Sequence, residues 1–221
     1  VCRELDLDPK KFPPRAFSHQ VSNLKNELVD EEEFASKASG TAERMLSEAY
    51  TLYQRRQREA QAQDFEDNIM TTVNVLRAFP AVAEHYRRRF RHVLVDEYQD
   101  TNHAQYALVR ELVGTDSAGD PPPAELCVVG DADQSIYAFR GASIRNILEF
   151  ERDYPDARTI LLEQNYRSTQ TILSAANAVI EKNPDRKPKR LWTDAGTGTK
   201  IVGYVADDEH DEASFVAEEI D

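Results

Sequence analysis

The fold is decided by a short stretch in the middle of the chain, where residues 93–99 read Val-Leu-Val-Asp-Glu-Tyr-Gln. A continuous apolar run rich in β-branched residues is typical of a strand buried on both faces of a parallel sheet. The carboxylates of Asp96 and Glu97 follow directly, and ligand sites of such sheets form at the carboxyl ends of the strands. The stretch therefore predicts a parallel sheet with an acidic site at its edge.

A second stretch repeats this design further along the chain. Residues 125–130 read Glu-Leu-Cys-Val-Val-Gly, and residues 131–134 read Asp-Ala-Asp-Gln. The glycine permits a sharp turn, and the amide of Gln134 can orient a water or meet a γ-phosphate. Two neighbouring acidic strand ends can hold Mg²⁺ and direct a water at a phosphate, so we expect a nucleoside-triphosphate site. The phosphate-cradling pattern G-x-x-x-x-G-K-[ST] does not occur in the 221 residues.

Helical and strand patterns alternate along the rest of the chain. Residues 17–62 are expected to be mostly helical, and Asp64 is expected to cap a helix that Pro80 stops. The other expected helices are 103–113, one from Ser143, one from Ser168, and 211–220. The expected strands are 92–96, 125–130, 159–162 and 200–205. This alternation predicts the α/β class, with a parallel sheet that has helices on both faces and follows an all-helical region.

Composition limits the classes of protein that remain. The net charge is −13, and charged residues make up 30% of the chain, which argues against nucleic-acid binding over the whole surface but leaves local basic patches open. No apolar stretch approaches the ~20 residues of a membrane span. We therefore expect a cytoplasmic protein without membrane partners. Because the chain begins with Val1 inside a helix-rich region, we expect it to be a piece of a longer protein.

Two cysteines, Cys2 and Cys127, are too few for a disulfide framework. Cys127 lies in an apolar run, so we expect a buried thiol. A basic run forms a separate feature, and it is either a solvated helix end or a contact for single-stranded DNA. Its members are Arg87, Arg88, Arg89 and Arg91.

Aromatic and basic residues form the remaining candidates. Tyr137 and Phe139 offer flat faces for nucleic-acid bases, with buried aromatics in a turn as the alternative. Residues 164–168 read Gln-Asn-Tyr-Arg-Ser. There Arg167 can serve as an arginine finger and Tyr166 can stack on adenine, although Arg167 taken alone reads as a surface residue beside a helix cap.

Taken together, three segments resemble motifs of the superfamily 1A DNA helicases of the UvrD/PcrA/Rep type. Residues 95–101 resemble motif II (Walker B), residues 129–137 motif III, and residues 162–168 motif IV. The resemblance extends over nearly the whole chain. It implies a P-loop NTPase of RecA-like fold in three parts: an inserted helical domain 1B (1–62), the C-terminal part of motor domain 1A (63–162), and the start of the second RecA-like domain 2A (163–221).

The resemblance also implies residue roles. Asp96 would coordinate Mg²⁺ together with Glu97, and Glu97 would activate the hydrolytic water. Gln134 would sense the γ-phosphate of ATP and Arg167 would contact it, while Tyr166 would stack on adenine.

A second set of residues would meet single-stranded DNA. These are Tyr137, Phe139 and Arg140. Phe139 stands where a tryptophan is familiar in the family, so base stacking is retained in a different form. Ala138 stands where a larger polar residue is familiar.

The implied function is an ATP-dependent 3′-5′ DNA helicase and translocase that acts on single-stranded DNA and on single-strand/duplex junctions. DNA repair, nucleoid association, and repair or replication proteins as partners are further expectations. Without the phosphate loop, these 221 residues alone are expected to be inactive as an ATPase. Two alternatives stay open: the helicase subunit of a recombination nuclease complex, and a non-catalytic module that binds single-stranded DNA or docks proteins.

Overall fold

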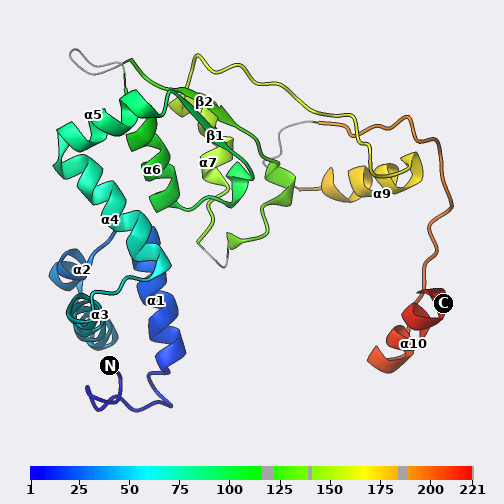
Figure 1. Ribbon diagram of the computed structural model, residues 1–221. Coiled ribbons are helices and arrows are strands. Elements are labelled where there is room, and N and C mark those ends of the chain that lie inside the picture. The colour runs from blue at the N-terminus through cyan, green and yellow to red at the C-terminus, as the bar shows by residue number, and fades with distance from the viewer. Residues whose placement is uncertain (116–121, 139–140, 184–188, 221) are drawn as a thin grey trace. The chain divides into compact units, whose positions relative to one another are not determined.

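The computed structural model describes residues 1–115, 122–138, 141–183 and 189–220. The chain forms two compact units, Val1–Ala157 and Arg158–Asp221 (Figure 1). Two predicted DNA contacts, Phe139 and Arg140, lie outside the described residues. Among the helices that are described, none has the length and apolar character needed to cross a membrane.

Three helices open the first unit, which confirms the helix-rich prediction for residues 17–62. They are α1 (Pro14–Asn26), α2 (Glu31–Lys37) and α3 (Thr41–Glu59). The apolar faces of α1 and α3 close a core because their large side chains recur at helical spacing. The buried members of this core are Phe17, Val21, Leu46, Ala49 and Tyr50.

Two further helices lead to the sheet, α4 (Phe65–Ala78) and α5 (Pro80–Arg89). The predicted cap of α4 is confirmed, since Asp64 Oδ1 accepts from the backbone N of Asp67 at 2.8 Å. Helix α4 ends before Pro80, as expected, but Pro80 also begins α5. Proline is favoured at the first position of a helix, where its missing N–H has no partner to lose.

The sheet consists of two parallel strands, β1 (His92–Val95) and β2 (Glu125–Val128), joined by α6 (His103–Val113). The predicted positions of both strands and of this helix are confirmed. Helix α6 packs against α4 and β1 (Figure 1), and Asn102 caps it by accepting from the backbone N of Gln105. The first unit is thus a helix-rich α/β unit with a small parallel sheet, and the described residues do not form a full RecA-like sheet.

Burial alternates along both strands. The prediction of a buried Cys127 thiol is wrong, because Cys127 is exposed and Leu94 lies largely in solvent as well. Helices cover one face of the strand pair, and the described part of the chain leaves the other face open. An apolar run shows which side chains favour burial, but it does not say what covers them.

The helix predicted from Ser143 is divided into two short ones, α7 (Arg145–Leu148) and α8 (Phe150–Asp153). Hydrogen bonds to Thr101 fix the start of this segment. The backbone N of Ser143 and the side-chain Nδ2 of Asn146 each donate to the Thr101 carbonyl oxygen at 3.0 Å. The segment is thereby held against the turn that follows β1.

The second unit contains α9 (Gln170–Ile180) and α10 (Glu209–Ile220) among its described residues. Thr169 rather than Ser168 is the N-cap residue of α9. The strands predicted at 159–162 and 200–205 do not form. Their apolar side chains are exposed, and the only strand-like pairing described in this unit is one isolated bridge between Gln164 and Trp192. A strand needs a neighbouring strand for its hydrogen bonds, and within the described residues neither segment is paired with one.

Candidate active site

The two acidic segments meet at the carboxyl end of the parallel sheet. Val129 N donates to Val95 O at 2.8 Å, and Tyr98 N donates to Val129 O at 2.9 Å. The backbone after β1 is therefore hydrogen-bonded to the backbone after β2. This confirms the prediction that the two acidic strand ends lie side by side, as the adjacent strands of Figure 1 also show.

Asp96 and Glu97 stand on a tight turn and are both exposed. Glu97 has left-handed backbone angles, φ 48° and ψ 45°, and its backbone N donates to Asp96 Oδ1 at 2.9 Å. A left-handed conformation is unfavourable by about 1–2 kcal/mol for a residue with a Cβ, and such strain is concentrated at functional sites. A 3₁₀ turn, η1 (Tyr98–Asp100), begins at the next residue, so the chain folds inward while both carboxylates face solvent.

Gln99 is a residue that the sequence did not single out, and it joins the two acidic segments. Its side chain is buried, with 1% exposed. Its Nε2 donates to Glu97 Oε2 at 2.7 Å, and its Oε1 accepts from the backbone N of Asp131 at 2.9 Å. Glutamine usually lies at the surface, so the sequence carried no signal of this role.

Residue 130 must be a glycine because neighbouring atoms leave no room for a Cβ, and not because of its backbone angles. A Cβ at this position would lie 2.6 Å from Gln99 Oε1 and 2.9 Å from Ile147 Cδ1. The following 3₁₀ turn, η2 (Ala132–Gln134), is organised by Asp131. Asp131 Oδ2 accepts from the Nε2 of Gln134 at 2.8 Å. The side chain of Gln134 is exposed at the same edge of the sheet as Glu97. Hydrogen bonds through Asp131 and Gln99 connect these two residues.

Of the three predicted DNA contacts, Tyr137 alone falls within the described residues, where it is half-buried. Ala138 beside it is exposed. Farther on, Gly141 has a positive φ of 83°, and a Cβ there would meet Asn26 Nδ2 at 3.1 Å. Gly141 therefore lies against the end of α1, and DNA contact by Tyr137 stays a prediction.

Tyr166 and Arg167 belong to the second unit, and both are exposed. Asn165 Oδ1 accepts from the backbone N of Arg167 at 3.0 Å and of Ser168 at 2.8 Å. The Tyr166 hydroxyl donates to Gln164 Oε1 at 3.0 Å, while the residue as a whole is 84% exposed. This turn presents an aromatic face and a guanidinium to solvent.

The carboxylates at the sheet edge can provide only part of the ligand shell of a Mg²⁺ ion. The described residues contain no group of three or more His, Cys, Asp or Glu side chains placed to hold a metal ion. Asp96 and Glu97 offer two carboxylates on one turn. Magnesium commonly takes one or two carboxylates and completes its shell with waters and substrate phosphates, so these residues fit a nucleotide-bound Mg²⁺ and not an all-protein metal site.

The basic run before β1 makes contacts within the protein. Arg87 Nε donates to the carbonyl oxygen of Glu111 at 2.8 Å, and Arg88 pairs with Glu84 on its own helix at 2.6 Å. Arg91 donates to the carbonyl oxygens of residues 122 and 123. These contacts agree with a structural role for the run at the end of α5.

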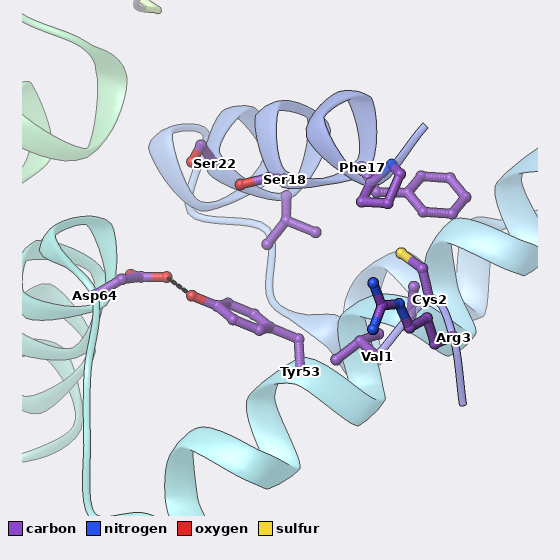
Figure 2. Close-up of a pocket in the computed structure, with 11 residues that line it drawn as sticks. Val1, Cys2, Arg3, Phe17, Ser18, Ser22, Tyr53 and Asp64 are labelled. Atoms are coloured by element: carbon purple, nitrogen blue, oxygen red, sulfur yellow. Dashed lines mark hydrogen bonds between the residues drawn. The ribbon is translucent and has the colours of Figure 1, made fainter. Parts of the chain in front are cut away.

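A cavity of about 450 Å³ lies at the helical end of the first unit, between the first residues, α1, α3 and Asp64. Figure 2 shows the Tyr53 hydroxyl directed at Asp64, to which it donates at 3.0 Å. Burial and this hydrogen bond raise the pKa of Tyr53 to about 12. Lys25, fully buried, lies 2.6 Å from Asp64 and 2.8 Å from Asp67. Asp64, which lines the cavity, therefore also belongs to a charge cluster that joins α1, α3 and α4.

Comparison with known proteins assigns both units to one family. Residues 1–155 match the model of the UvrD/REP helicase N-terminal domain. The chain belongs to the UvrD/REP helicase family. Residues 160–221 match the UvrD-like helicase C-terminal domain, so the resemblance indicated by the three motif-like segments is confirmed.

Similar relatives of this UvrD/REP-family chain carry helicase names. It is 67% identical over 224 residues to the ATP-dependent DNA helicase UvrD1 of Mycobacterium tuberculosis (strain ATCC 25618 / H37Rv) and 64% identical over 227 residues to UvrD1 of Mycobacterium leprae. It is 50% identical over 220 residues to the ATP-dependent DNA helicase PcrA of Bacillus subtilis. Each alignment covers 100% of this chain and 29% of the relative. The chain therefore spans 29% of the length of these relatives.

Proposed function

We propose that this chain is the central part of an ATP-dependent DNA helicase that moves 3′-5′ along single-stranded DNA and unwinds duplexes during DNA repair. The observation that carries the proposal is the pairing of two acidic turns at one sheet edge, joined through Gln99. The helicase names of the relatives support it. They favour a UvrD-type helicase over a subunit of a recombination nuclease complex.

The proposed domain assignment follows the resemblance. Residues 1–62 correspond to a helical domain 1B, residues 63–162 to part of a RecA-like motor domain 1A, and residues 163–221 to the start of domain 2A. In such a P-loop NTPase the phosphate loop, which is not among these 221 residues, would hold the nucleotide. The present residues would supply the acidic half of the site.

Each site residue has a proposed task in ATP hydrolysis. Asp96, with Glu97, would hold Mg²⁺, which when bound neutralises phosphate charge. Glu97 orients the attacking water and accepts its proton. Gln134 senses the γ-phosphate through its amide, and Arg167 offsets the charge that develops there. Tyr166 stacks its exposed ring on adenine.

DNA contact is assigned to the segment after η2. Tyr137, Phe139 and Arg140 would contact successive nucleotides, with aromatic faces on bases and the guanidinium on phosphate. Stacking does not depend on sequence, because every base has a π-face. Single-stranded DNA and single-strand/duplex junctions are therefore the proposed substrates, and repair or replication proteins near the nucleoid are the proposed partners.

The test compares Asp96→Ala and Glu97→Gln in the full-length protein. Because a general base contributes about 10²–10⁴-fold, we expect DNA-stimulated ATP hydrolysis to fall about 100-fold or more in Glu97→Gln. Binding of a fluorescent oligonucleotide should stay within about twofold, since neither carboxylate holds DNA. Unchanged ATPase activity in either variant would contradict the proposal and favour a docking or DNA-binding module.

A second measurement concerns the 221 residues alone. Without a phosphate loop they should show no ATP hydrolysis above the buffer rate, with or without single-stranded DNA. Measurable DNA-stimulated turnover by this chain would contradict the proposed division of the active site.

A further inference from the structure

The side-chain amide of Gln99 is engaged at both ends. Its Nε2 donates to Glu97 Oε2 and its Oε1 accepts from the backbone N of Asp131. A carboxylate can only accept and a backbone N–H can only donate, so these partners fix which end of the amide faces which segment. Gln99 thus contacts both acidic turns, and both hydrogen bonds would be lost if its amide were reversed.

The surroundings of Gln99 confine its side chain to this position. Its Oε1 occupies the space that a Cβ on Gly130 would need. Its own carbonyl oxygen accepts from the hydroxyl of Ser135 at 3.4 Å, and the backbone of Tyr98 before it is held by Val129. A side chain fixed by packing and by hydrogen bonds is the arrangement that holds a neighbouring reactive group in place.

Glu97 needs such a support. Its side chain is long and exposed, and free rotation would spread its carboxylate over many positions. The bond from Gln99 restrains one carboxylate oxygen from the protein side and leaves the other available. On the far side, Asp131 binds the amide of Gln134, so one continuous row of hydrogen bonds runs from Glu97 to Gln134.

We propose that Gln99 is a positioning residue for ATP hydrolysis, which holds the Glu97 carboxylate in place and couples it to the turn that carries Asp131 and Gln134. The inference rests on the proposed function, in which Glu97 acts on the hydrolytic water. Gln99 itself contacts neither the water nor the nucleotide. A shift of the Asp131 turn is transmitted to the Glu97 carboxylate through the Gln99 amide.

Two variants with side chains of similar size, made in the full-length protein, distinguish the hydrogen bond to Glu97 from the hydrogen bond to Asp131. Gln99→Glu keeps an oxygen for the backbone N of Asp131 but turns a carboxylate oxygen toward Glu97. Gln99→Met keeps the length of the side chain and removes both bonds. We expect the DNA-stimulated kcat to fall about tenfold or more in both variants. The KM for ATP and the Kd for single-stranded DNA should change little, because the residues proposed to bind ATP and DNA are unchanged. The Tm should fall in both variants, since Gln99→Met removes two buried hydrogen bonds and Gln99→Glu adds a buried carboxylate beside Glu97, so kcat is measured well below the lowered Tm.

The control is Gln105→Glu, the same chemical change at the capping-box position of α6, where glutamate serves as well as glutamine. It should keep the original kcat. Wild-type kcat in Gln99→Glu would overturn the inference. A loss of kcat in Gln99→Met alone would also overturn it, because Gln99 would then only anchor Asp131. Glu97→Gln is measured in the same series: full ATPase activity in that variant would refute the proposed function itself, whatever the Gln99 variants do.

Discussion

Asn102 donates a hydrogen bond from its Nδ2 to the Oδ1 of Asn26 over 2.9 Å, across 76 positions of the chain. Both side chains are buried. Asn26 ends α1, and Asn102 caps α6 directly after the acidic turn. A pair of hydrogen-bonded amides therefore joins the helical region at the start of the chain to the segment that follows the candidate active site.

Breaking this pair should destabilise the first unit. In Asn26→Ala, the buried Nδ2 of Asn102 loses its acceptor, and an unsatisfied buried group costs about 1–3 kcal/mol. Urea unfolding of the full-length protein should show a free energy of unfolding lower by that amount. Asn23→Ala, one turn earlier on the exposed side of α1, should change it by no more than about 0.5 kcal/mol. Equal effects of the two variants would contradict the role of the amide pair.

The stability of the helical region should depend on pH through Asp64. Burial raises the pKa of this carboxyl, but hydrogen bonds from Lys25 and from the backbone of Asp67, with the charge of Lys25, outweigh burial and hold the pKa below its usual value. A group with a lowered folded pKa stabilises the fold above its unfolded pKa, and this contribution is lost as the pH falls through the folded value. We expect the free energy of unfolding to decrease below about pH 4.

The comparison variant is Asp64→Asn, which keeps the oxygen that caps α4 but removes the charge facing Lys25. Its unfolding, followed in urea from about pH 7 down to about pH 3, should lack this part of the acid loss. Glu48→Gln removes an exposed carboxylate on α3 and serves as the control. The assignment to Asp64 would fail if Asp64→Asn and the native protein lost stability in parallel.

Gly130→Ala should disturb the candidate site by a steric clash. The new methyl group would lie 2.6 Å from Gln99 Oε1, and overpacking of this kind costs about 1–3 kcal/mol. Because Gln99 must move, we expect the kcat for ATP to fall about tenfold. Gly203→Ala meets nothing within 4 Å, and its kcat and Tm should match those of the native protein. A normal kcat in Gly130→Ala would show that the position of Gln99 is not critical.

Tyr166 is expected to act through its ring and not its hydroxyl. Tyr166→Phe removes the hydrogen bond to Gln164 and should keep the KM for ATP. Tyr166→Ala removes the stacking face, which is worth about 1–3 kcal/mol per base, so the KM for ATP should rise about tenfold with little change in kcat. Steady-state kinetics on the full-length protein measures both. A raised KM in Tyr166→Phe would assign the effect to the hydroxyl instead.

Part of the fold was predictable because its causes are local. The apolar run before Asp96 formed β1, and the Asn102–Gln105 capping box began α6 where expected. The strands expected at 159–162 and 200–205 did not form, because a strand depends on a neighbouring strand that the local sequence does not reveal. Cys127 was misjudged for the same reason, since burial needs a covering layer.

The sequence by itself indicated the two acidic strand ends, at Asp96 and Glu97 and at Asp131 to Gln134, and the family to which the chain belongs. These are properties of residue type and spacing, which short patterns record. Only the tertiary structure decided that Gln99 joins those ends and that Gly130 must lack a side chain. Both facts depend on contacts between residues about thirty positions apart, and such contacts exist only once parallel strands lie side by side.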